Sequence, residues 1–123
     1  MLARLTAVFT LLLILLTLSL SACSSSSLSP EAQRGEVVFT AQCAVCHSLI
    51  EDKVIVGPSM VGIKSRAGDR VDGMDATAYL YASLSEPGSY LVEGYQDLMP
   101  FNIGRDLTDQ ARDDVVAYLL TLE

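Results

Sequence analysis

The only histidine of the chain directly follows a pair of cysteines, in the motif Cys43-x-x-Cys46-His47. Two thiols at this spacing can each bond to one edge of a porphyrin, and the next residue then faces the metal. The motif therefore indicates covalent attachment of a c-type haem. On the motif alone, two other interpretations stay open. A C-x-x-C pair can be a thiol–disulfide redox centre, normally on a βαβ unit, or half of a zinc site, which needs four ligands. The sequence has no strand–helix–strand pattern nearby and no second cysteine pair, which favours haem.

The sequence also restricts the sixth ligand of a haem iron. A second histidine is excluded because His47 is the only one. A methionine, a less usual ligand such as Lys53 or Lys64, or an open position remain. Met99 is 52 residues beyond His47, far enough for the chain to cross to the opposite haem face. The proline that follows it, Pro100, favours an extended backbone there.

We predict that Met99 is this ligand. Met74, in an acidic loop, is the second candidate, and Met60 is expected to fill the core on the histidine side. Ligation by histidine and methionine raises the reduction potential of a cytochrome haem. It also leaves the iron no position for a substrate, so the prediction is one-electron transfer and not catalysis. The alternative is a gas-binding or sensory haem protein whose sixth position is open or displaceable.

Two more residues are predicted to act at this site. Pro58 offers a carbonyl, and a metal-bound histidine such as His47 usually donates its other ring N–H to such an acceptor. Arg66 is a candidate partner for a haem propionate. Its other interpretation is a solvated loop charge, and the sequence does not separate the two.

The first 29 residues contain a predicted export signal and a predicted acylation site. Residues 1–22 resemble a secretory signal, with Arg4, an apolar stretch and then small residues. The stretch ends in Leu20-Ser21-Ala22-Cys23, similar to the lipobox of bacterial lipoproteins, in which the cysteine is acylated and begins the mature chain. The alternative is an uncleaved N-terminal helix with an incidental thiol at Cys23. Residues 23–29 are then an acylated cysteine and a flexible serine-rich linker.

Both interpretations of the N-terminus predict the same location. A diacylglyceryl group carries two chains, enough for stable anchoring where a single acyl chain is marginal. The domain is therefore expected on the outer face of the bacterial cytoplasmic membrane, on its periplasmic or extracytoplasmic side.

The chain after residue 22 is acidic. Without Arg4, seven Lys and Arg stand against fifteen Asp and Glu, a net charge of −8. This balance disfavours nucleic acid and anionic lipid headgroups as partners. We expect a redox protein with a basic patch, or a multi-subunit electron-transfer complex.

Residues 30–123 are predicted to be one domain with helices but no convincing strand. Ser29 can cap a helix from Pro30 to about Ala44, which would deliver the cysteine motif at its end. Gly35 lies inside this helix, either because another helix crosses closely there or as a tolerated surface glycine.

Two further helices are predicted. One covers Ala78–Ser85, capped by Thr77 or Asp75, and the other covers Asp109–Thr121, capped by Thr108. The stretches 64–68 and 88–104 are predicted to be loops. Three apolar residues of the middle helix are expected to face the haem or to form ordinary core: Tyr79, Leu80 and Leu84.

These residues together resemble the class I monohaem cytochromes c. The shared pattern is Gly35-x-x-x-Phe39-x-x-x-Cys43-x-x-Cys46-His47, then Gly57-Pro58, Met99-Pro100 and Tyr118-Leu119. The resemblance implies a small all-α fold in which the N- and C-terminal helices cross at Gly35, Phe39 and Tyr118. It also implies loops wrapped around one covalent haem c, and a function as an electron carrier.

The stretch 84–100 is especially similar to the cytochrome c domain fused to some oxidase subunit II chains. It also resembles the lipid-anchored monohaem subunit of bacterial alternative complex III. The copper ligands of an oxidase subunit II are absent, so only the haem domain is shared. These likenesses imply either a free carrier or a non-catalytic subunit of a respiratory or photosynthetic complex.

Overall fold

A computed structural model of the protein describes residues 28–123. The predicted signal peptide 1–22, the predicted acylation site Cys23 and most of the predicted linker lie outside the described residues. All regular structure within 28–123 is helical, which confirms the predicted all-α class. No helix in this part of the chain has both the length and the apolar character needed to cross a bilayer.

The first described helix, α2 (Pro30–Val38), begins as predicted. The Ser29 side chain accepts a hydrogen bond from the Ala32 N–H at 3.2 Å, and Pro30 occupies the first turn, where its missing N–H costs nothing. The helix does not continue as an α-helix to Ala44. Over η2 (Phe39–Cys43) the chain forms a wider π-helical turn, and the Ala44 N–H bonds to the Phe39 carbonyl at 2.9 Å. This turn leads directly into the cysteine motif.

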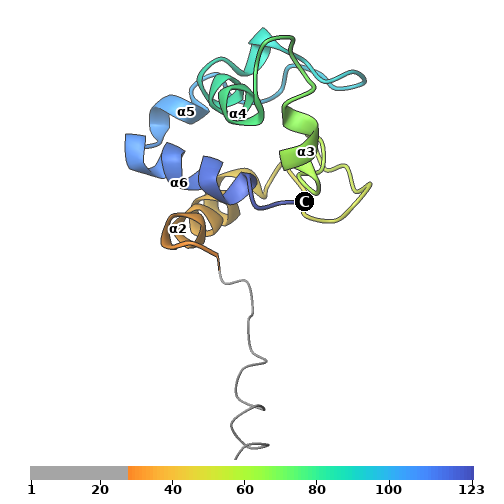
Figure 1. Cartoon of the computed structure of the whole chain (residues 1–123). Helices are drawn as coiled ribbons and strands as arrows, with labels where there is room; N and C mark the ends of the chain where they lie inside the picture. The colour runs from red at the N-terminus through yellow and green to blue at the C-terminus, as the bar shows by residue number, and fades with distance from the viewer. Residues whose placement is uncertain (1–27) are drawn as a thin grey trace, which may run out of the picture.

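The last helix, α6 (Asp109–Leu119), is capped by Thr108, as predicted, and ends two residues before the predicted Thr121. Figure 1 shows α6 crossing α2. At the crossing, a Cβ on Gly35 would lie 1.9 Å from the Asp114 carbonyl oxygen, which no side chain can do. The structure therefore favours the close crossing over a surface glycine.

Two side-chain contacts complete this crossing. The rings of Phe39 and Tyr118 pack with their centroids 5.6 Å apart. Arg34 donates two hydrogen bonds, of 2.8 and 2.7 Å, to the carboxylate of Asp114, which is only 3% exposed. The crossing at Gly35, Phe39 and Tyr118 is the arrangement that the resemblance implied.

Helix α4 (Ala76–Ser85) lies across the domain from the α2–α6 pair (Figure 1). Asp75, and not Thr77, is its cap: the Asp75 carboxylate accepts from the Ala78 N–H at 2.7 Å, so the helix starts two residues earlier than the predicted Ala78. A short 3-10 turn, η3 (Pro87–Ser89), follows the helix.

Two short helices, α3 (Ile63–Ala67) and α5 (Ile103–Asp106), lie largely in stretches that the sequence predicts to be loops. Neither has a side-chain cap. Helix α3 begins after Gly62, whose φ is +67°, and α5 is a single turn after Asn102. One or two turns without a cap leave almost no periodic signal, so these elements depend on packing against the rest of the domain.

Candidate haem-binding site

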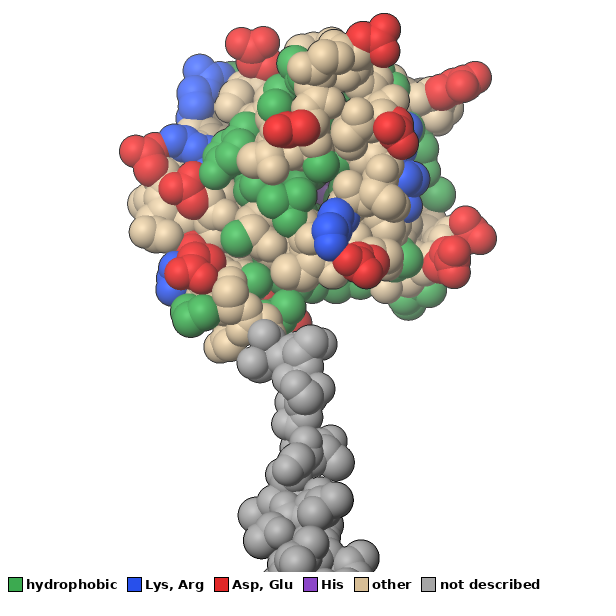
Figure 2. All heavy atoms as spheres, in the orientation of Figure 1, with side chains coloured by type: hydrophobic (Ala, Val, Ile, Leu, Met, Phe, Trp, Pro, Cys, Tyr) green, Lys and Arg blue, Asp and Glu red, His purple; other side chains and the backbone are tan. Residues whose placement is uncertain are grey.

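A cavity lies between the α2–α6 pair and the segments opposite it. It contains about 1350 Å³ of empty space, counting its open mouth. Six residues predicted to serve one site all line it: Cys43, Cys46, His47, Pro58, Arg66 and Met99. Figure 2 shows apolar side chains gathered at the centre of one face of the domain and acidic side chains spread around its edge. The fold thus brings together residues that are far apart in the sequence.

The cysteine motif forms a tight turn in the cavity wall. The N–H groups of Cys46 and His47 both bond to the Cys43 carbonyl, at 3.0 and 2.9 Å. Both thiols are free and half-buried. Burial, and next the charge of Cys46, raise the pKa of the Cys43 thiol to about 11. Burial therefore favours the neutral thiol at Cys43.

The structure contains the predicted hydrogen bond between His47 and Pro58, with Nδ1 2.8 Å from the carbonyl oxygen. A carbonyl only accepts, so Nδ1 carries the proton and Nε2 keeps the lone pair that a metal needs. Burial lowers the pKa of His47, and the Pro58 carbonyl partly opposes the shift. The imidazole is therefore neutral at pH 7, the form that binds metal.

The loop that carries Pro58 also brings the backbone of Gly57 directly against the imidazole of His47. A Cβ on Gly57 would lie 2.5 Å from Cε1 of His47, so a side chain there would displace the ring. The N–H groups of Val56 and Gly57 bond to the Cys46 carbonyl, at 3.2 and 3.0 Å. The loop is thus tied to the motif whose histidine it orients.

Of the candidates for the sixth ligand, Met99 is half-buried and lines the cavity. Met60 also lines it, but from the loop that holds His47, and it packs against the core, in line with its expected filling role. Met74 is 37% exposed and does not line the cavity. Lys53 is exposed, and Lys64 forms an ion pair with the last residue of the chain; neither lines the cavity.

Arg66 is not the solvated loop charge of the second interpretation. It lies on α3, half-buried, and its guanidinium donates to the carbonyls of Ser59, at 2.9 Å, and Val61. Its role toward a propionate stays a prediction. Arg70, which has no motif in the sequence, lines the cavity as well. Arg70 lies beyond the end of α3, so no helical spacing marks it in the sequence.

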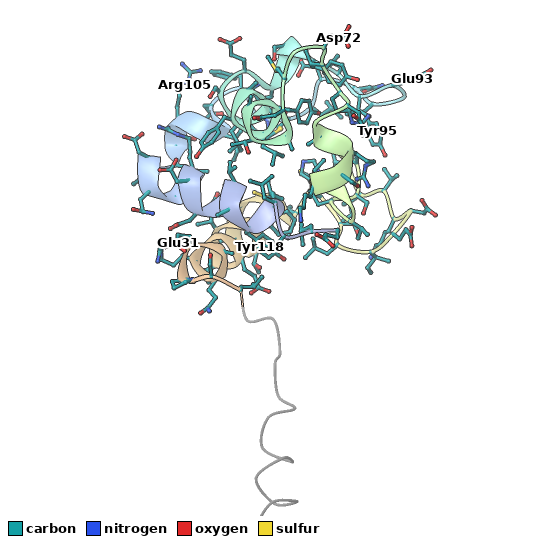
Figure 3. All side chains as sticks on the ribbon, viewed as in Figure 1. Glu31, Asp72, Glu93, Tyr95, Arg105 and Tyr118 are labelled. Carbon is teal, nitrogen blue, oxygen red and sulfur yellow. The ribbon has the colours of Figure 1, made fainter. Side chains whose placement is uncertain are left out.

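Aromatic side chains also line the cavity, among them Tyr79, which the sequence predicts, and two tyrosines that it does not. Tyr79 is both buried core and cavity wall, so its two interpretations hold together. Its ring meets that of Tyr90 edge-on, with centroids 5.8 Å apart, and Tyr90 and Tyr95 line the cavity from the segment after α4. Figure 3 shows Tyr95 on this segment, with Glu93 projecting outward. No local pattern marks Tyr90 or Tyr95.

The cavity suits a covalent haem: it has two thiols, an imidazole with a free lone pair and a mostly apolar lining. Comparison with known proteins agrees. Residues 32–123 match the family model described as Cytochrome c. The chain belongs to the cytochrome c family. A relative, the cytochrome c2 of Rhodopseudomonas palustris, is 29% identical over an alignment 119 positions long, which spans 76% of this chain and 99% of the relative.

Family membership establishes the class of function. This class I cytochrome c binds one haem c covalently and serves haem-based electron transfer. The zinc and thiol–disulfide interpretations of the cysteine motif are therefore wrong. Among residues 28–123, moreover, no group of three or more His, Cys, Asp or Glu side chains is arranged to hold a metal ion.

Proposed function

We propose that this cytochrome c passes single electrons between redox proteins while a lipid on Cys23 anchors it to the outer face of the bacterial cytoplasmic membrane, with His47 and Met99 as axial ligands. The observation that carries the ligand assignment is the cavity itself. Met99 lines the same cavity as Cys43 and His47, whereas Met74 lies on the surface.

Each residue then has a defined task. Cys43 and Cys46 supply the thioether bonds, Pro58 fixes the tautomer and orientation of His47, and Met99 provides a soft sulfur ligand. The haem supplies an iron that gains or loses one electron. Apolar walls exclude water and, with the methionine, favour the reduced state. Because the chain supplies both axial ligands, no position is left for a substrate.

The mouth of the cavity is the natural place for electrons to enter and leave. Four apolar side chains that line the cavity are also exposed: Val45, Val56, Leu91 and Leu98. An apolar centre within an acidic surface suits a partner that presents an apolar spot inside a basic patch (Figure 2).

The ligand assignment is tested with Met99→Ala. We expect the variant to keep its covalent haem, lose the sulfur-to-iron charge-transfer band of the oxidised protein and have a lower reduction potential. Met74→Ala is the matched control and should leave both properties unchanged. A band that survives in Met99→Ala would contradict the assignment and favour another methionine.

The anchor is tested separately, by mass spectrometry of the membrane-extracted protein. We expect a mature chain that begins at Cys23 and carries the mass of the lipid, and a Cys23→Ser variant that is not acylated. A chain that retains unmodified residues 1–22 would contradict the lipoprotein proposal without affecting the ligand assignment.

The resemblance to oxidase subunit II domains and to the alternative complex III subunit supports either a free carrier or a complex subunit. Gentle detergent extraction followed by size-exclusion chromatography separates the two. A subunit elutes with other redox proteins, and a carrier elutes alone.

A further inference from the structure

Met99 is the last residue before a segment that is hydrogen-bonded to α5. Pro100 follows it, and the Pro100 carbonyl accepts from the Ile103 N–H at 3.0 Å. The N–H groups of Arg105 and Asp106 both bond to the Asn102 carbonyl, each at 2.9 Å. These three hydrogen bonds join Pro100 to the start of α5 and Asn102 to its end. A displacement of α5 therefore moves the backbone next to Met99.

Helix α5 packs closely against α4 at Gly104, which is buried. A Cβ there would lie 2.3 Å from the carbonyl oxygen of Leu84 and 2.8 Å from its carbonyl carbon. Both are backbone atoms of the last turn of α4, so they cannot rotate out of the way. Leu84 is itself only 4% exposed and lines the cavity, which makes this end of α4 a firm support.

Gly104 is held from a second side by α6. Its carbonyl accepts a hydrogen bond from Nη1 of Arg112 at 2.7 Å. Arg105, the next residue, is exposed and projects outward from α5 (Figure 3). One backbone position of the Met99 segment thus touches α4 and bonds to α6, while its neighbour faces solvent.

We infer that Gly104 is a positioning residue for Met99: it allows α5 to lie directly on α4, and this contact holds the methionine at the cavity. The inference rests on the proposed ligation by Met99. An alanine at position 104 must push α5 away from Leu84, and the segment with Met99 moves with it. The bond between the methionine and the iron then weakens, although residue 104 lines no part of the cavity.

The test is competition between Met99 and added imidazole for the oxidised haem protein. In Gly104→Ala we expect the apparent imidazole affinity to rise by about tenfold or more, equivalent to ~1.4 kcal/mol, because the competing methionine is held less well. The charge-transfer band should weaken, and the haem should stay covalently attached. Gly68→Ala is the matched control: φ is −71° there, and the nearest contact of its Cβ is an ordinary 3.5 Å. It should bind imidazole like the unaltered protein.

A second, milder variant covers the case in which Gly104→Ala does not fold. Arg112→Met removes the donor to the Gly104 carbonyl, leaves the glycine in place and should raise the imidazole affinity several-fold. Unchanged imidazole affinity and an unchanged band in the folded variants would overturn the inference. Failure of the ligand assignment is seen separately, as a band that persists in Met99→Ala.

Discussion

The orientation of His47 depends on backbone groups of the neighbouring loop and not on reactive side chains. The carbonyl of Pro58 selects the tautomer, and Gly57 contributes only the absence of a side chain. Arg66 holds the carbonyl groups of the next residues of the same loop. The sequence alone predicted the role of Pro58. It could not predict the close approach of Gly57 to the ring, because that contact exists only once the loop folds back onto the motif.

A residue-scale prediction concerns Asp114. The Arg34 guanidinium holds the pKa of this carboxylate below its ordinary value of 3.8; burial opposes the shift and Gln110 reinforces it. Since the folded pKa is lower than the unfolded one, the pair stabilises the fold above pH 3.8 and loses this effect as the pH falls through the folded pKa.

The measurement is the midpoint of thermal unfolding of the oxidised protein between pH 2 and pH 7. Asp114→Asn should lower the midpoint most at neutral pH, and its difference from the unaltered protein should shrink as the solution becomes more acidic. Asp72→Asn, a change of an exposed loop residue (Figure 3), should have little effect at any pH. A difference for Asp114→Asn that stays constant with pH would contradict the assignment.

Among the helices, α2 and α6 cross so closely that the crossing leaves no room for a side chain at Gly35. Gly35→Ala would set a Cβ 1.9 Å from the Asp114 carbonyl oxygen and 2.8 Å from the Tyr118 Cβ, so the helices must separate. We expect a loss of about 1–3 kcal/mol in the free energy of unfolding, typical of overpacking, or more, because a backbone atom is involved.

Denaturant unfolding monitored by circular dichroism tests this prediction. Val37→Ala is the control on the same helix, because Val37 is 69% exposed and its truncation should change the free energy of unfolding little. Equal stabilities of Gly35→Ala and the unaltered protein would show that the crossing is looser than described.

The elements also show what the sequence could and could not predict. The sequence predicted the helices that begin at a polar cap: Ser29 and Thr108 mark the starts of α2 and α6. Helices α3 and α5 were missed because no side chain caps them and they are too short for a periodic pattern. The π-helical η2 was missed because its wider turn has no composition of its own, and the sequence predicted an unbroken helix there.

The residues of the site also divide into those that a local motif predicts and those that only the fold brings together. The thiols, the histidine and the Met-Pro pair lie in local motifs, so the sequence could predict them, and the structure places all of them at one cavity. Arg70 and Tyr90 reach the cavity only through the arrangement of α3 and the segment after α4. Gly104 and Leu84 are far apart in the sequence as well, and neither has a motif that reveals their contact.

For the whole molecule, the net charge predicts how the rate of electron transfer with charged reagents depends on ionic strength. With a net charge of −8 after residue 22, electron transfer with a small cationic reagent should slow several-fold when ionic strength rises from about 0.01 to about 0.15 M, since the screening length falls from ~30 to ~8 Å. Transfer with an anionic reagent should become faster. Stopped-flow rates with hexaammineruthenium and ferricyanide test this; rates that change in the same direction would contradict electrostatic steering.

The central claim, a haem iron closed by His47 and Met99, is tested most directly by optical spectra of the purified full-length protein in both oxidation states, with and without carbon monoxide. We predict a low-spin spectrum in both states, a sulfur-to-iron charge-transfer band in the oxidised protein and no spectral change when carbon monoxide is added. A high-spin spectrum with ready binding of carbon monoxide would contradict the claim and would instead identify a gas-binding haem protein.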